Sequence, residues 1–86
     1  METHIILGIH VTDRVSKAGS VQEVLTEYGC NIKTRVGLHE AAEGACSANG
    51  VIVLEMFGDE AKADEMSGRL SAIDGVEVKK MVFEHA

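Results

Sequence analysis

The sequence has no proline, no low-complexity stretch and only two cysteines, Cys30 and Cys46. Nothing in it marks a linker, so we expect a single domain over residues 1–86. The two cysteines form neither a CxxC pair nor the dense framework of a small disulfide-bonded domain. We therefore expect both thiols to be reduced.

Long apolar runs and surplus positive charge are also missing. The longest apolar runs, Ile5–Leu7 and Val51–Leu54, are far shorter than the roughly 20 residues that span a bilayer. There are 8 basic side chains and 14 acidic ones, and the net charge of −6 repels phosphate backbones and anionic lipids. We expect a cytoplasmic protein that has no membrane segment and does not bind nucleic acid directly.

The apolar residues, 45% of the chain, follow two different periodicities. Where they alternate with polar residues they predict strands, and where they recur every three or four residues they predict two helices, which end at Gly29 and Gly75. The small and polar residues 41–50 predict a loop that closes with an Asn49–Gly50 turn. The predicted strands cover residues 4–11, 30–38, 51–57 and 76–84.

The predicted order is therefore strand, helix, strand, strand, helix, strand. Residues 28–34 line up with residues 74–80, so the two halves form a weak internal repeat of βαβ units. When the split crossovers of two such units interleave, they produce a four-stranded antiparallel sheet in the order 4-1-3-2 with both helices on one face. The sequence predicts an α+β protein with the ferredoxin-like βαββαβ plait.

Two helices can cover only one face of this sheet. We expect them to cover the side of Ile5, Ile32 and Val36, and we expect Cys30 to be a small buried hydrophobe on that side. The other face would expose a larger apolar patch than soluble monomers usually tolerate, so we expect a homo-oligomer, either a dimer or a tetramer. The expected interface residues are Ile6, Ile52, Leu54, Met56, Met81 and Phe83.

Three side chains suggest a metal site at one end of the bare face. His10 ends the first predicted strand, His39 follows the second, and Cys46 lies in the predicted loop above them. The first two strands are parallel with one strand between them, which places their backbones roughly 9 to 10 Å apart. Imidazole and thiolate ligands would suit nickel, copper or zinc. The alternative is that all three are polar residues of an oligomer interface.

A second candidate site lies on the predicted outer side of the second strand. Arg35 and Lys33 stand beside one another there and could hold an anionic ligand. Arg35 is the better candidate because its planar guanidinium pairs with a carboxylate through two hydrogen bonds. The alternative is an ion pair at the surface or between subunits.

Catalytic patterns are not evident. No serine or cysteine nucleophile has a histidine and a carboxylate at assignable positions, and residues 44–50 lack the Lys-Ser/Thr ending of a phosphate-binding loop. We do not expect an enzyme.

Two segments, Asn31–Gly37 and Leu70–Val76, together with the element order and the acidic composition, resemble the iron-only hydrogenase system regulators. The resemblance covers nearly the whole chain. It implies a free-standing ACT-type domain, similar to the C-terminal domain of nickel-responsive repressors, with an oligomeric regulatory or effector-binding role. Those repressors use a His-x-His pair on the second strand, and Thr34–Gly37 has none, so their nickel site does not carry over.

The same resemblance adds Asp13 to Arg35 and Lys33 as a candidate ligand contact. Asp13 lies in the turn after the first strand, near which ACT domains bind effectors, although this turn lacks the glycine often found there. We interpret the chain as a small regulatory domain, related to transcription regulators, that acts as an oligomeric ligand-sensing or protein-interaction module. The alternatives are a metal-binding sensor without its own DNA-binding domain and a purely structural interaction domain.

Overall fold

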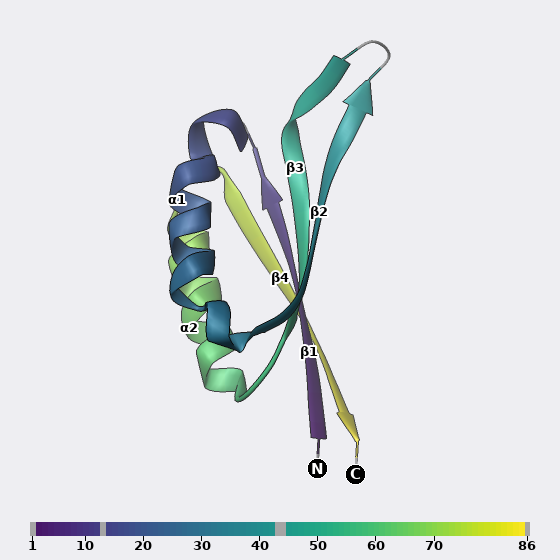
Figure 1. Ribbon diagram of the computed structural model, residues 1–86, viewed down its shortest axis with the longest axis vertical. Coiled ribbons are helices and arrows are strands. Elements are labelled where there is room, and N and C mark those ends of the chain that lie inside the picture. The colour runs from purple at the N-terminus through teal and green to yellow at the C-terminus, as the bar shows by residue number, and fades with distance from the viewer. Residues whose placement is uncertain (1, 13, 43–44, 86) are drawn as a thin grey trace.

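The structure is a computed structural model that describes residues 2–12, 14–42 and 45–85 (Figure 1). A short 3₁₀ turn, η1 (Gly29–Asn31), follows the first helix. The strands are β1 (Glu2–Val11), β2 (Ile32–Ala42), β3 (Ala45–Met56) and β4 (Val76–His85), and the helices are α1 (Arg14–Glu27) and α2 (Glu60–Ser71).

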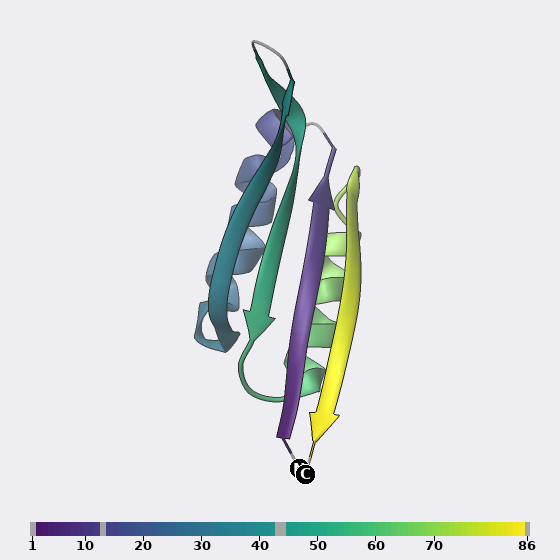
Figure 2. The same cartoon turned by 90° about the vertical axis from the view of Figure 1, so that its right-hand side faces the viewer.

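The predicted fold is confirmed. The four strands form one antiparallel sheet in the order β2-β3-β1-β4, which is the predicted order read from the other edge. Both helices pack on the same face of the sheet (Figure 1). Figure 2 shows the opposite face, which no helix covers. Among the described residues, no helix is long and apolar enough to cross a membrane.

Local sequence signals explain where α2 begins and ends. The side chain of Asp59 caps its first turn, where Oδ1 accepts a hydrogen bond of 3.1 Å from the backbone N–H of Lys62. Gly58 precedes the cap with a φ of 100°, and Gly75 follows the helix with a φ of 84°. Both angles lie in the left-handed region that favours glycine, so the two glycines fix the connections to β3 and β4.

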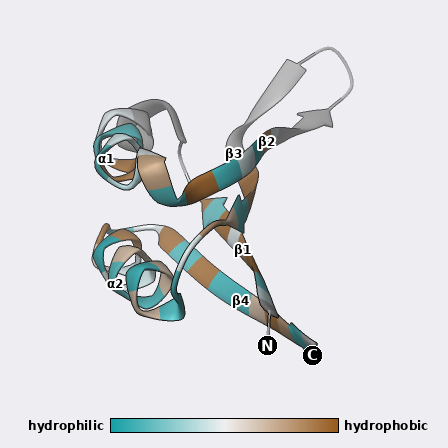
Figure 3. Cartoon of the chain, turned by 60° about the horizontal axis from the view of Figure 1, so that its bottom comes forward, coloured by the Kyte–Doolittle hydropathy of each residue, from teal (hydrophilic) through white to brown (hydrophobic). Residues whose placement is uncertain are grey.

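The hydrophobic core lies between the sheet and the two helices. Figure 3 shows hydrophobic and hydrophilic residues following one another along β4, as expected for a strand with two different faces. Burial of the hydrophobic core side chains is the main source of stability for so small a domain. The largest fully buried side chains are Ile5, Leu7, Ile9, Val21, Leu54, Met66 and Leu70.

The predicted orientation of β3 is wrong. Leu54 pairs with Leu7 and is fully buried, and Met56 pairs with Ile5 and is also buried, so both belong to the core and not to an oligomer interface. Ile52 likewise packs against the core. The physical reason is that β3 is apolar on both of its faces, so alternation alone could not fix its orientation.

The start of β2 also differs from the prediction. Residues 29–31 form η1, so the strand begins at Ile32, and Cys30 is exposed rather than buried. An irregularity in pairing between Ile32 and Thr34 reverses the alternation that follows. Val36 consequently pairs with Val53 on the face without helices, where 47% of it is exposed.

Most of the predicted loop over residues 41–50 lies in strands. β2 continues to Ala42 and β3 begins at Ala45, so Asn49 and Gly50 lie inside a strand and do not form a turn. β1 ends at Val11, opposite Gly50. The β2–β3 hairpin therefore extends beyond the end of β1 as a two-stranded arm (Figure 1).

Lys80 joins the edge strand β4 to α2 on the helix side of the sheet. Its Nζ donates hydrogen bonds of 2.6 Å to Asp64 Oδ1 and 2.7 Å to Glu60 Oε2. The hydrogen bond to Asp64, followed by that to Glu60, raises the pKa of Lys80 above its usual 10.5. A folded-state pKa above the unfolded one means that the contribution to stability is complete below the unfolded value and is lost as pH rises through the folded value.

We therefore expect Lys80→Met to lower the melting temperature at pH 8, and to reduce the further fall in melting temperature that we expect for the unmodified chain between pH 9 and pH 12. Thermal unfolding followed by circular dichroism across that range measures both effects. Lys62→Met is the matched control, because Lys62 forms its ion pair with Glu65 within the same helix. An identical alkaline fall in the unmodified chain and Lys80→Met would contradict the assignment.

Candidate functional site

The sheet face without helices is the candidate functional surface, and we call it the open face. Its residues follow from the strand register, because alternate residues of a strand point to opposite faces and cross-strand partners share a face. Ile6 pairs with Glu55 and Met81, and Gly8 pairs with Val53 and Lys79. The open face comprises His4, Ile6, Gly8, His10, Thr34, Val36, Val51, Val53, Glu55, Glu77, Lys79, Met81 and Phe83.

Large apolar side chains on the open face are half exposed. Val36 is 47% exposed, and Met81 and Phe83 are each 53% exposed. Ile6, Met81 and Phe83 lie on the face to which the sequence assigned them. Val36, Val51 and Val53 were missed, because the register between β1 and β3 places Val51 and Val53, and the register between β2 and β3 places Val36. Together these side chains form an apolar surface that neither helix covers within a single copy of the chain.

A charged group borders this apolar surface at the β2–β3 side. Glu55 Oε2 lies 3.8 Å from His4 Nδ1 and 3.8 Å from Lys33 Nζ. The Thr34 hydroxyl donates a hydrogen bond of 3.5 Å to Glu55 Oε1. Glu55 is thus the shared partner of side chains from three places on the open face, and it remains partly exposed to solvent.

The two basic residues proposed as an anion site do not converge. Arg35 pairs with Leu54 and therefore lies on the helix side, where its Nη1 donates a hydrogen bond of 3.0 Å to Gln22 Oε1 of α1. Lys33 reaches instead to Glu55. The irregularity at the start of β2 separates them, so the predicted pairing of Arg35 with Lys33 on one face is wrong. Asp13, the third candidate, lies outside the described residues.

The proposed metal ligands do not lie opposite one another in the sheet. His10 pairs with Val51, whereas His39 pairs with Gly50. Cys46 is five residues along β3 from Val51, or about 16 Å at the usual rise of a strand, and not in a loop above His10. The described parts of the chain contain no group of three metal-binding side chains. The side chains of His39 and Cys46 lie outside that description, so the metal site stays a prediction.

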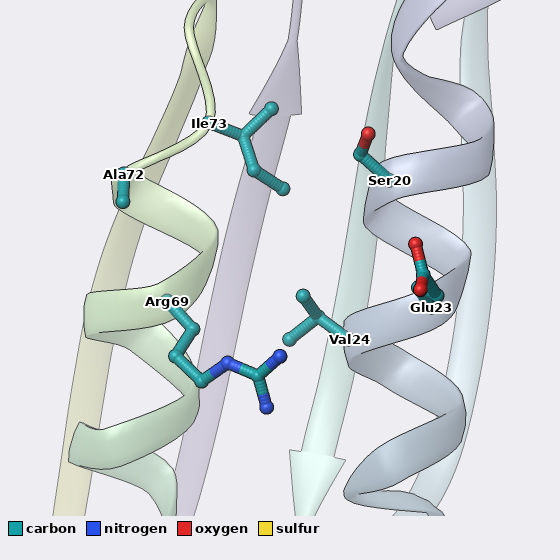
Figure 4. A pocket seen from close by; sticks show the side chains of 6 residues that line it. All are labelled: Ser20, Glu23, Val24, Arg69, Ala72 and Ile73. Atoms are coloured by element: carbon teal, nitrogen blue, oxygen red, sulfur yellow. The ribbon is translucent and has the colours of Figure 1, made fainter.

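A shallow groove of about 330 Å³ lies between the two helices. Arg69 crosses it, as Figure 4 shows. Its guanidinium forms an ion pair with Glu27 and lies 5.6 Å from the ring centre of Tyr28. The hydrogen bond that this guanidinium donates to Glu27 raises the pKa of Arg69 above its already high ordinary value. The groove is lined by Ser20, Glu23, Val24, Arg69, Ala72 and Ile73.

These contacts give Arg69 a structural role. It connects α2 to the end of α1 through Glu27 and Tyr28, so its charge already has a partner within the chain. The groove offers little depth for a ligand, whereas the open face carries half-exposed apolar side chains on both of its edge strands. The open face is therefore the stronger candidate.

The architecture and the uncovered sheet face define the class of the protein as a ferredoxin-like α+β domain with one open face. A family model described as "Iron-only hydrogenase system regulator, putative", TM1266-like, matches residues 4–80. The chain belongs to this family. The resemblance stated from the sequence is thereby confirmed.

Solved structures agree with this assignment. The protein TM1266 from Thermotoga maritima is 30% identical, with a TM-score of 0.80, and the match covers 96% of this chain and 100% of that one. CPII, a nitrogen regulatory PII-like protein from Thiomonas intermedia K12 bound to ADP, AMP and bicarbonate, has a TM-score of 0.58 at 14% identity, covering 99% of this chain and 97% of that one.

A dimeric ferredoxin-like protein from an uncultured marine organism has a TM-score of 0.52 at 9% identity, and the match covers 94% of this chain and 92% of that one. At identities this low, CPII and the marine protein show the shared fold alone. No curated protein matches the chain.

Proposed function

We propose that this chain is a non-catalytic regulatory module that works as a homo-oligomer assembled through the open face. The observation that carries the proposal is the apolar surface of Ile6, Val36, Val53, Met81 and Phe83, which neither helix covers. Soluble proteins rarely leave a large contiguous apolar patch exposed, and self-association is the commonest way of covering one. Membership of a family described as regulators supports a regulatory role.

The module acts by changing its assembly, or the conformation of a partner protein, when an effector binds. The net charge of −6 disfavours direct binding to nucleic acid, so the effect on a regulated system passes through a protein or small molecule. A related fold that is dimeric supports assembly, and a nucleotide-bound PII-like relative adds adenine nucleotides to the effectors worth testing. We place the protein in the cytoplasm.

Sedimentation velocity of the unmodified chain tests the assembly. At micromolar concentration we expect a discrete oligomer, a dimer or a tetramer, whose population falls on dilution. A monomer throughout the micromolar range would overturn the proposal, because the apolar face would then persist uncovered.

A thermal-shift panel tests the regulatory role. We expect at least one metal, amino acid or adenine nucleotide in the panel to raise the melting temperature, and nickel, copper and zinc are included for His10, His39 and Cys46. A ligand at 100 times its dissociation constant adds about 2.7 kcal/mol to the free energy of unfolding, or about 10 to 20 °C in a domain of this size. If no ligand in the panel shifts the melting temperature, a purely structural interaction domain is the better account.

A further inference from the structure

Gly8 lies at the centre of the open face and has no evident role within its own chain. It is in the middle of β1, an inner strand of the sheet, and its cross-strand partners are Val53 and Lys79. Glycine weakens the interior of a strand, because it adds backbone entropy to the unfolded state and supplies no side chain to pack. Its presence at this position needs a specific reason.

The two usual reasons for a strand glycine do not apply inside this chain. The positive φ angles of the described glycines are at Gly58 and Gly75, so the backbone of Gly8 is one that other residues adopt. A Cβ atom added to Gly8 would have no atom within 4 Å, so crowding does not exclude a side chain either. A strand glycine also marks a place where a ligand or another chain approaches closely.

We propose that Gly8 forms a socket that receives an apolar side chain from the open face of a second copy of this chain. The inference rests on the proposed function and specifies its contact. Ile6 and His10 flank the glycine along β1, and Val53 and Lys79 flank it across the sheet. Because Gly8 has no side chain, a side chain of the second copy can approach the backbone of β1 at the centre of this surface.

The charges favour a second copy as the occupant. Among the described side chains, the charged ones on or reaching the open face are Lys33, Lys79, Glu55 and Glu77, so their positive and negative charges balance, with two histidines beside them. The chain as a whole carries −6. The surplus negative charge therefore lies elsewhere and repels other copies there, whereas the open face meets its own copy without net repulsion.

The dimensions of the face also suit such a contact. Four strands spaced about 4.8 Å apart and a β1 of 10 residues give a flat area of roughly 600 Å². Specific protein interfaces bury about 600 to 1,000 Å² on each partner, so the open face reaches the lower end of the size that such an interface needs.

A two-fold arrangement makes the contact reciprocal. In such an interface the same surface serves both copies, so each offers a socket and a side chain to fill the partner's socket. Met81 and Phe83 are the most exposed apolar side chains on the open face. They are the side chains available to enter the socket of the second copy.

Gly8→Val tests the socket because it should weaken association of the chains without lowering the stability of the monomer. Valine favours strands and has room in the single chain, so the stability of a monomer should stay equal or rise. The same valine fills the socket, so the dissociation constant of the oligomer should rise at least tenfold. Sedimentation equilibrium measures association, and thermal unfolding of Gly8→Val in the monomeric Met81→Asp/Phe83→Asp background measures stability.

Gly37→Val is the matched control. A Cβ atom at Gly37 would also have no atom within 4 Å, but Gly37 pairs with Ile52 on the helix side of the sheet, so association should be unchanged. The socket is refuted if Gly8→Val associates as tightly as the unmodified chain, or if it destabilises the monomeric background. If Met81→Asp/Phe83→Asp dissociates the oligomer while Gly8→Val does not, the socket fails and the proposed function stands. A monomeric unmodified chain would overturn both.

Discussion

Replacing both Met81 and Phe83 with aspartate is expected to convert the oligomer to monomers that remain folded. Complete burial of such a side chain contributes about 1.5–3 kcal/mol, and each is 53% exposed in the single chain, so about half of that remains to be gained. A two-fold interface contains four of these side chains, which together contribute about 3–6 kcal/mol. The dissociation constant should therefore rise by about a hundredfold or more, as measured by sedimentation equilibrium.

Phe57→Asp is the control for this double variant. Phe57 is even more exposed, at 65%, but it follows the end of β3 and is not part of the open face. It should leave association unchanged while imposing the same kind of substitution on the surface. If Phe57→Asp dissociates the oligomer and the double variant does not, copies of the chain meet at the end of the sheet near Phe57 and not through the open face.

Leu54→Ala is expected to remove a large share of the free energy of unfolding. Leu54 is fully buried in the core opposite Leu7, and truncating a buried leucine costs about 2–5 kcal/mol through lost burial and the cavity that remains. Domains of this size have about 4 to 13 kcal/mol in total. Urea denaturation should show a lower midpoint with a similar slope, or an already unfolded chain at 37 °C.

Val53→Ala provides the comparison, because Val53 directly precedes Leu54 on the same strand but lies on the open face. Measured in the monomeric Met81→Asp/Phe83→Asp background, it should cost much less than Leu54→Ala. Equal losses at the two positions would mean that the assigned orientation of β3 is wrong, and with it the composition of the open face.

The order of elements and the order of strands could be predicted from the sequence because each rests on a strong local signal. Alternation is clear in β1, and Gly58 and Gly75 bound the second helix. These signals, with the chirality of βαβ units, leave few possible topologies. The fold could therefore be predicted without knowledge of any contact between residues distant in the sequence.

The composition of the open face could not be predicted in full, because it depends on pairing between distant strands. β3 has apolar residues on both faces, and only its register with β1 shows that Leu54 faces inward and Val53 outward. At the start of β2, the turn η1 and the irregularity after Ile32 move Cys30 to the surface and Arg35 to the helix side. Each error assigns side chains to the wrong face of the sheet, because a shift of one residue along a strand exchanges the faces to which its side chains point.

The placement of β1 between β3 and β4 has a consequence for how the protein forms during synthesis. β1 is synthesised before the other three strands, but one of its two neighbours is β4, and Glu2 pairs with His85, more than 80 residues further along the chain. Contacts so distant in sequence form late, so one edge of an apolar strand stays without hydrogen-bond partners until β4 has been synthesised. An unpaired edge of this kind recruits other extended chains. Premature termination before β4 should therefore yield aggregates rather than a smaller soluble domain.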